Sequence, residues 1–103
     1  MYQLFFYVPP SHAEPVKAAV FAAGGGRIGN YDCCAWQARG VGQFRPRAGA
    51  RPAIGAVDAL ETLEEWRVEL VVADECVPQV VAALRAAHPY EEPAFGVIRL
   101  EDF

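Results

Sequence analysis

Four short segments of the chain are rich in apolar residues or alternate apolar with polar ones, and each is predicted to be a strand. The clearest alternation runs through residues 60–72, where mostly charged residues separate the apolar ones. Asp58 and Glu61 have the spacing to cap a short helix there instead, but the period of two fits better toward the C-terminal end. The four predicted strands are residues 2–8, 28–44 with a bulge or bend at its glycines, at least 64–73, and 94–100.

A helix is predicted after the first strand, because apolar residues then recur every three or four positions. Pro9-Pro10 ends the strand, and Ser11 with Glu14 has the spacing of a capping box, with Pro15 in the first turn. The glycines at residues 24–26 end this helix. Its predicted apolar face consists of Val16, Ala19, Val20 and Ala23.

A second helix is predicted between the third and fourth strands, beginning near Pro78 and ending at His88-Pro89. Its predicted apolar face consists of Val77, Val80, Val81 and Leu84. The resulting order, β-α-β-β-α-β, predicts an α+β, ferredoxin-like (split βαβ) domain over residues 1–103, with both helices on one face of a four-stranded antiparallel sheet. The other face of the sheet would be bare, and Trp36 and Trp66 need cover, so we expect a homo-oligomer.

Composition narrows the class of protein. The 103 residues are 53% hydrophobic and 21% charged, which is typical of one folded domain rather than a disordered chain. The net charge of −4 argues against nucleic-acid binding, and no apolar run is long enough to span a membrane. The N-terminal stretch lacks a basic region and is interpreted as a strand rather than a signal peptide, so we expect a cytoplasmic protein with three reduced cysteines.

Three stretches, in order along the chain, resemble motifs of one protein family. Residues 24–34 read GGGRIGNYDCC and resemble its GAGxIGNYxxC motif, and residues 40–46 read GVGQFRP and resemble GxGxFxP. Residues 88–94 read HPYEEPA and match the third motif closely. The chain thus resembles the small CutA-like domain of the NGG-interacting-factor-three-like proteins, also described as dinuclear-metal hexameric proteins, and is interpreted as a stand-alone relative of that domain.

The resemblance implies a CutA-like fold that forms trimers, with a regulatory or assembly role. It does not imply the family's metal centre, which His and acidic residues of a larger domain hold in the full-length proteins. This chain has only two His residues and could not rebuild such a centre alone. A metal-dependent hydrolase or GTP cyclohydrolase activity is therefore not expected of it.

The motif residues with polar or aromatic side chains are candidates for binding a small molecule at a cleft between subunits. The predicted ligand-binding residues are Asn30, Tyr31, His88, Tyr90, Glu91 and Glu92. The alternative is structural: the prolines stiffen the turn after the second helix, Tyr90 packs, and His88 complements the C-terminus of the helix. In this alternative the carboxylates of Glu91 and Glu92 accept hydrogen bonds from backbone N–H groups or pair with arginines of a partner.

Arg45, Arg47 and Arg51 form the basic cluster of this acidic chain, within residues 45–55, which are predicted to be an exposed loop. Guanidinium groups match phosphates and carboxylates, so the cluster predicts an anion-binding site. A solvated loop, or one that pairs with acidic residues of a neighbouring subunit, is the alternative.

Cys33, Cys34, His12 and His88 are the candidate ligands for a transition-metal ion, and thiolates would favour copper(I) or zinc. Neighbours on a strand point to opposite faces, so the thiols of Cys33 and Cys34 are expected to diverge, and packing is the alternative role. With the two helices taken as parallel, His12 and His88 lie at opposite ends of the helix layer and do not meet within one chain. Residues 24–29 satisfy GxGxxG in a reversed context, after a helix and before a strand, which favours a cap and turn over nucleotide binding.

Three functional hypotheses are consistent with these residues. The first is a small oligomeric ligand-binding or regulatory module, whose ligand the sequence does not identify. The second is a metal-binding tolerance protein of CutA type, for copper or a divalent cation. The third is an enzyme, or a partner for a separately encoded larger domain of the same family. The chain has no G-x-S-x-G, H-E-x-x-H or C-x-x-C pattern, which makes catalysis by this chain alone the weakest hypothesis.

Overall fold

The computed structural model describes residues 1–103, and the elements follow the predicted order. The strands are β1 (Tyr2–Val8), β2 (Trp36–Phe44), β3 (Glu61–Val72) and β4 (Phe95–Arg99). The helices are α1 (Pro10–Ala22) and α2 (Val77–Ala87), and a 3-10 turn, η1 (Asp74–Cys76), precedes α2. The predicted α+β class is confirmed.

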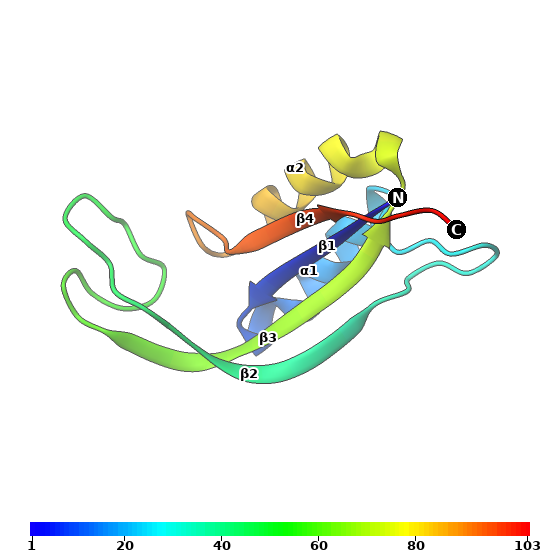
Figure 1. The fold of residues 1–103 in the computed structure, drawn as a ribbon. Helices are drawn as coiled ribbons and strands as arrows, with labels where there is room; N and C mark the ends of the chain where they lie inside the picture. Colours follow the sequence, from blue (N-terminus) through cyan, green and yellow to red (C-terminus); the bar gives the residue numbers. More distant parts are fainter.

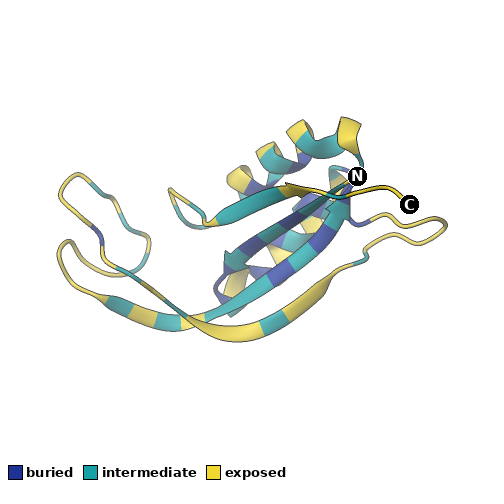
Figure 2. Cartoon of the chain, viewed as in Figure 1, coloured by how far each residue is buried: buried dark blue, intermediate teal, exposed yellow.

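The strands form one antiparallel sheet in the order β2-β3-β1-β4, with both helices on the same side of it (Figure 1). This is the ferredoxin-like arrangement. Alternate residues of β1 and β3 face the helices and are buried, and Figure 2 shows these buried positions concentrated at the centre of the molecule. The core consists mainly of Leu4, Phe6, Val8, Val16, Val20, Val68, Leu70, Val72, Val80 and Leu84.

The other face of the sheet is uncovered. At its centre Arg67 lies over the ring of Phe5, at 4.3 Å from the centroid, and donates a hydrogen bond to the Tyr7 hydroxyl at 2.8 Å. Trp36, at the start of β2, lies on this face of the sheet and is 59% exposed. Trp66 was predicted to need cover on this bare face, but this prediction is wrong, because Trp66 packs partly against the core.

Helix α1 begins one residue earlier than the predicted cap. Pro9 is the N-cap residue and makes no side-chain cap, while Pro10 occupies the first turn, where its fixed φ suits a helix and its missing N–H has no partner to lose. The predicted capping box is therefore wrong: Ser11 lies inside the helix, and its hydroxyl is 2.9 Å from Nδ1 of His12. Pro15 consequently lies inside the helix rather than in its first turn.

The second predicted strand is shorter than expected. Residues 27–35 form a loop with one isolated bridge, between Ile28 and Tyr31, and β2 starts only at Trp36. Cys33 has a positive φ of 55°, which an extended strand does not accommodate. The argument that a strand makes the thiols of Cys33 and Cys34 diverge therefore does not apply.

The two helices run antiparallel, and the prediction that they are parallel is wrong. Strands β1 and β3 are antiparallel, α1 follows β1 and α2 follows β3, so the helix directions must also oppose each other. The start of α1 therefore lies at the same end of the layer as the end of α2. Burial first, and in addition the nearby His12, lower the pKa of His88.

Strands β2 and β3 extend beyond the rest of the sheet as a two-stranded arm. β1 pairs with β3 only from Trp66 to Val72, whereas residues 61–65 of β3 pair with β2 alone. In Figure 1 the arm reaches past the end of β1 and carries the loop of residues 45–60 at its tip. The helix considered near Asp58 does not form; Asp58 has a φ of 64°, and its N–H donates to Pro46 O at 2.7 Å.

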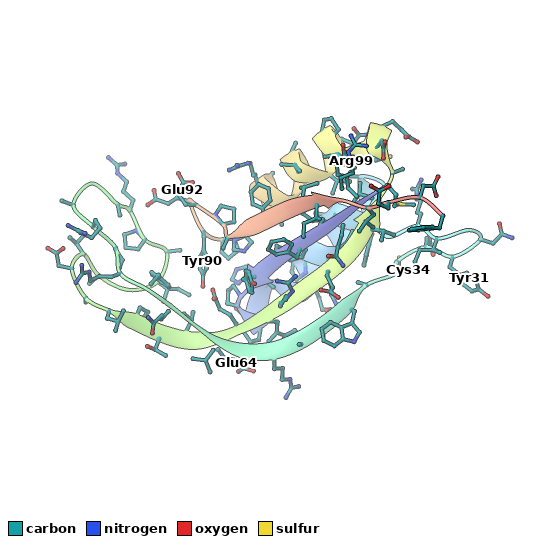
Figure 3. All side chains as sticks on the ribbon, in the orientation of Figure 1. Tyr31, Cys34, Glu64, Tyr90, Glu92 and Arg99 are labelled. Carbon is teal, nitrogen blue, oxygen red and sulfur yellow. The ribbon has the colours of Figure 1, made fainter.

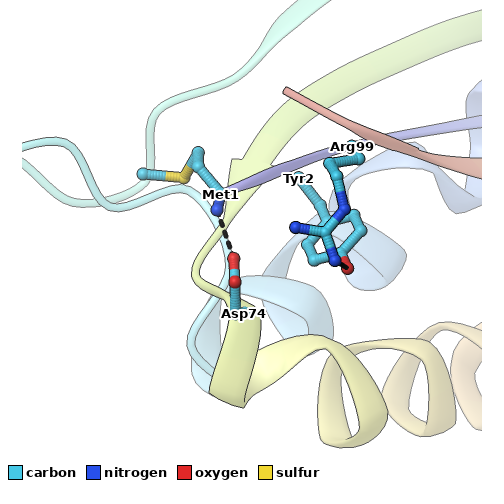
Figure 4. A network of polar contacts seen from close by, with 4 residues as sticks. All are labelled: Met1, Tyr2, Asp74 and Arg99. Carbon is cyan, nitrogen blue, oxygen red and sulfur yellow. Dashed lines mark hydrogen bonds and ion pairs between the residues drawn. The ribbon is translucent and has the colours of Figure 1, made fainter. Parts of the chain in front are cut away.

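Side-chain contacts close the opposite end of the sheet. The Met1 amino group pairs with Asp74 of η1, and Arg99 of β4 donates to the Tyr2 hydroxyl at 2.6 Å (Figure 4). Arg99 also lies over the Tyr2 ring, 5.0 Å from its centroid.

None of the helices has the length and apolar character that crossing a membrane requires.

Candidate functional site

A pocket of about 340 Å³ lies between the tip of the arm and the turn that joins α2 to β4. Its volume is at the small end of the range for ligand sites, roughly 300–1,000 Å³. We call residues 45–55 the arginine loop and residues 88–93 the HPYEEP turn. The polar lining includes Arg45, Arg47, Glu65, Tyr90, Glu91 and Glu92. The apolar lining includes Phe44, Pro46, Pro52 and Ile54.

The arginine loop is attached to the HPYEEP turn by direct contacts. The backbone N–H of Arg51 donates to Oε1 of Glu91 at 2.8 Å, across forty positions of sequence. The rings of Phe44 and Tyr90 pack with their centroids 6.0 Å apart. In Figure 3 Tyr90 projects from the turn toward the arm. The pocket is thus enclosed by two segments that are distant in sequence.

The His88 ring connects the HPYEEP turn to strand β1 by hydrogen bonds. Its side chain is only 6% exposed, and its Nδ1 accepts a hydrogen bond from the Tyr90 N–H at 3.1 Å. A backbone N–H is always a donor, so Nδ1 carries no proton and Nε2–H donates to Tyr7 O, at 2.7 Å. Both ring nitrogens are engaged within the chain. His88 therefore has a structural role that orders Tyr90, through contacts other than the predicted one with the C-terminus of the helix.

Tyr90 brings a buried hydroxyl group to the pocket wall. This hydroxyl has no hydrogen-bond partner within the chain. Burial first, then the negative charge of Glu65, a hydrogen-bond interaction with that same carboxylate, and last the charge of Glu61 raise the pKa of Tyr90 to about 12, so the phenol is neutral at physiological pH. The Glu65 carboxylate therefore approaches the hydroxyl closely enough for a hydrogen-bond interaction that raises the pKa of Tyr90, although the pair does not meet the geometry of a fully formed hydrogen bond. An unpartnered buried hydroxyl is costly, which favours a ligand group or water beside it.

Positive charge is available on the loop side of the pocket. Arg45 and Arg47 line the pocket, are exposed, and form no ion pair with any carboxylate of the chain. Arg51 contributes its backbone N–H to Glu91 and is not among the lining residues. The pocket therefore combines two free guanidinium groups, an apolar wall and a neutral phenol.

The predicted ligand-binding residues separate into two groups. Tyr90, Glu91 and Glu92 lie at the pocket together with Arg45 and Arg47, two of the three arginines that were predicted as a different site. Asn30 and Tyr31 lie in the exposed 27–35 loop, and Figure 3 shows Tyr31 at the opposite end of the molecule from Tyr90. A single cleft formed by the turn and the GNYD stretch does not exist within one chain.

The predicted metal ligands do not come together. Cys33 and Cys34 lie in the 27–35 loop, where the Cys34 thiol donates to Asp32 O at 3.6 Å, whereas His12 and His88 lie at the other end. No group of three or more His, Cys, Asp or Glu residues in the chain is arranged to hold a metal ion. His12 and His88 share one end of the helix layer, contrary to the prediction, but the ring nitrogens of His88 are already bonded.

Sequence reasoning missed Glu65 and Phe44 as site residues. Glu65 was one of several charged residues in an alternating strand, and nothing in the pattern separated it from Glu61 or Glu69. The useful signal was Gly42: a Cβ atom at that position would coincide with Oε1 of Glu65, so the glycine leaves room for the carboxylate over β2.

Known proteins with a similar sequence support the resemblance. The chain is 52% identical over 94 residues to the GTP cyclohydrolase 1 type 2 homolog of Mycobacterium bovis, and 42% identical over 100 residues to that of Halalkalibacterium halodurans. These matches cover 91% and 97% of this chain but only 25% and 27% of the relatives, so the chain spans about a quarter of their length. No family model matches the chain.

A solved structure of a Bacillus cereus protein related to NIF3 superimposes on 98% of the chain with a TM-score of 0.84 and 37% identity, covering 26% of that protein. The chain is a relative of one part of the NIF3-related proteins. CutA1 of Pyrococcus horikoshii and CutA of Archaeoglobus fulgidus match the whole chain with TM-scores of 0.72 and 0.69, at 16% and 15% identity. These two establish the fold alone. The predicted kinship with the CutA-like part of the NIF3-related proteins is confirmed.

Proposed function

We propose that this chain is a small ligand-binding or regulatory module whose site is the pocket between the arginine loop and the HPYEEP turn. The ligand has an apolar body that packs on Phe44 and the loop prolines. It carries a negative group that Arg45 and Arg47 bind. The observation that carries the proposal is that two segments predicted as separate sites enclose one pocket with free guanidinium groups.

The two guanidinium groups support an anionic ligand despite the nearby carboxylates. Glu91 is already engaged by the backbone N–H of Arg51, and Glu92 is exposed to solvent. Arg45 and Arg47 have no such partner. A carboxylate or phosphate at the loop side would supply the charge that the chain itself does not provide.

The test uses 4-methylbenzoate, a carboxylate on an apolar ring, as the probe. We expect saturable binding by calorimetry or NMR, weakened by about tenfold to a hundredfold in Arg45→Gln or Arg47→Gln, because a charge-assisted hydrogen bond contributes roughly 1.5–3 kcal/mol. Arg27→Gln is the matched control, since Arg27 is exposed in the 27–35 loop and changes the charge equally. Failure of the probe to saturate, or equal weakening by Arg27→Gln, overturns the proposal.

We further propose that the module is a homo-oligomer, with a trimer as the preferred state, and that it assembles through the uncovered face of the sheet. We also propose that it is located in the cytoplasm. The exposure of Trp36 and of Ile98, at 59% and 47%, supports a covering partner of the same kind, because apolar patches on a sheet are usually buried by protein. Light scattering on the purified chain, mass 11.2 kDa per subunit, tests it. A monomer at all concentrations contradicts it.

A further inference from the structure

We propose that the pocket selects a ligand that carries a protonated amino group in addition to its negative group, and that Glu65 and the Tyr90 hydroxyl recognise this amine. The ligand class is a small zwitterion: an apolar body with an ammonium group at the inner end and a carboxylate or phosphate at the arginine loop. This inference rests on the proposed function, because it assigns the chemistry of the second end of the same pocket.

Glu65 is a carboxylate at the pocket that has no cationic partner within the chain. It is half-buried in the arm, lines the pocket and forms no ion pair within the chain. Partly buried carboxylates are normally paired, since desolvation of an isolated charge is unfavourable. The chain supplies cations elsewhere in the pocket, at Arg45 and Arg47, but neither approaches Glu65 within ion-pair distance. A cationic group of the ligand would pair with the Glu65 carboxylate at this end of the pocket.

The Tyr90 hydroxyl is the second observation. It is buried, makes no fully formed hydrogen bond, and has the Glu65 carboxylate as its neighbour, whose charge and hydrogen-bond interaction raise the pKa of Tyr90. A neutral phenol oxygen accepts a hydrogen bond from an N–H donor, and an ammonium group has three such donors. One amine could therefore satisfy both Glu65 and Tyr90, which a second anionic group could not do.

The ring of Tyr90 and that of Phe44 form an aromatic wall beside this end of the pocket. The rings of Phe44 and Tyr90 meet at a tilt of 54°, with centroids 6.0 Å apart, and both line the pocket. Aromatic faces attract organic cations. A metal cation is a poorer match, because hard divalent ions need several oxygen ligands and the chain offers no group of three or more acidic, His or Cys residues.

Gly42 gives a way to move Glu65 without removing its charge. A Cβ at position 42 would coincide with Oε1 of Glu65, the far end of a flexible side chain, so Gly42→Ala should displace the carboxylate while β2 is retained. Gly40→Ala is the matched control, because its Cβ would lie 3.6 Å from the Glu65 carbonyl oxygen, an ordinary contact.

The experiment compares three probes by titration: 4-(aminomethyl)benzoate, which has both charged groups, 4-methylbenzoate, which lacks the amine, and 4-methylbenzylamine, which lacks the carboxylate. The readout is the ratio of the first two affinities. We expect a gain of about tenfold from the amine in the wild type and in Gly40→Ala, a magnitude typical of one ionic contact. The gain should fall to about one in Glu65→Gln and in Gly42→Ala.

Each outcome separates this inference from the proposed function. If 4-methylbenzoate binds and the amine adds nothing, the inference fails and the proposed function stands. If the gain persists in Glu65→Gln, the amine is recognised elsewhere and the inference also fails. If 4-methylbenzylamine binds as tightly as the zwitterion, the arginines have no role and the proposed function fails. Thermal melting of each variant confirms that it is folded.

Discussion

Replacing His88 with alanine is expected to destabilise the folded chain by about 2–5 kcal/mol and to abolish binding in the pocket. The substitution removes the partner of two backbone groups, Tyr7 O and Tyr90 N–H, in a site where His88 is 6% exposed. Each group left buried without a partner contributes roughly 1–3 kcal/mol, and the lost ring leaves a cavity. Denaturant unfolding measures the stability, and titration with 4-methylbenzoate measures the binding.

His12→Ala is the control for this prediction. His12 is exposed, its ring forms a hydrogen bond with the hydroxyl of Ser11, and its loss should change stability by no more than about 0.5 kcal/mol. An alanine at position 88 that left stability and binding at the wild-type level would mean that the HPYEEP turn is held by other contacts.

Gly26→Ala is expected to destabilise the chain by about 2–5 kcal/mol through the loop at the other end of the molecule. Gly26 has a φ of 74°, and a Cβ there would lie 2.8 Å from Cys34 O and 2.8 Å from the Phe21 ring. The backbone at this position also joins the loop to β3, since the Gly26 N–H donates to Val71 O at 2.8 Å. Chemical denaturation compares the variant with the wild type.

Gly29→Ala separates backbone strain from crowding. Gly29 also has a positive φ, 56°, but nothing lies within 4 Å of a Cβ at this position. Its cost should therefore be limited to the left-handed conformation, about 1–2 kcal/mol. Equal effects of the two substitutions would show that the close approach at Gly26 does not matter.

The elements of the fold could be predicted because local pattern and tertiary packing agree. The alternation in β3 persists in the structure, since its apolar positions Val68, Leu70 and Val72 face the helices and form much of the core. Helix α2 lies where proline and the apolar spacing placed it. In these segments one face is buried, so the pattern of residues carries direct information about structure.

Other features could not be read from local pattern. The loop of residues 27–35 contains tyrosine, cysteine and isoleucine, which favour a strand, but positive φ values at Gly29 and Cys33 turn the backbone away from one. Ser11 and Glu14 had the spacing of a cap, yet Pro10 already begins the helix. In both cases backbone conformation overrides residue preference.

The candidate site was only half predictable. The sequence singled out the arginine loop and the HPYEEP turn, but nothing local indicated that a contact between Arg51 and Glu91 would join them. That contact depends on the long β2–β3 arm, whose register follows from pairing across the whole sheet. The relative position of His12 and His88 was mispredicted because the helix directions follow from the antiparallel pairing of β1 with β3.

The pocket between the arginine loop and the HPYEEP turn is the proposed binding site of the ligand. Amide chemical-shift mapping of the ¹⁵N-labelled chain during titration with 4-methylbenzoate tests it most directly, because each backbone amide reports on its own surroundings. We expect saturable shifts at residues 43–54 and 90–94 and at Tyr7 and Glu65, which line the pocket, and none in the 27–35 loop. Shifts centred on the 27–35 loop, or scattered without saturation, would contradict it.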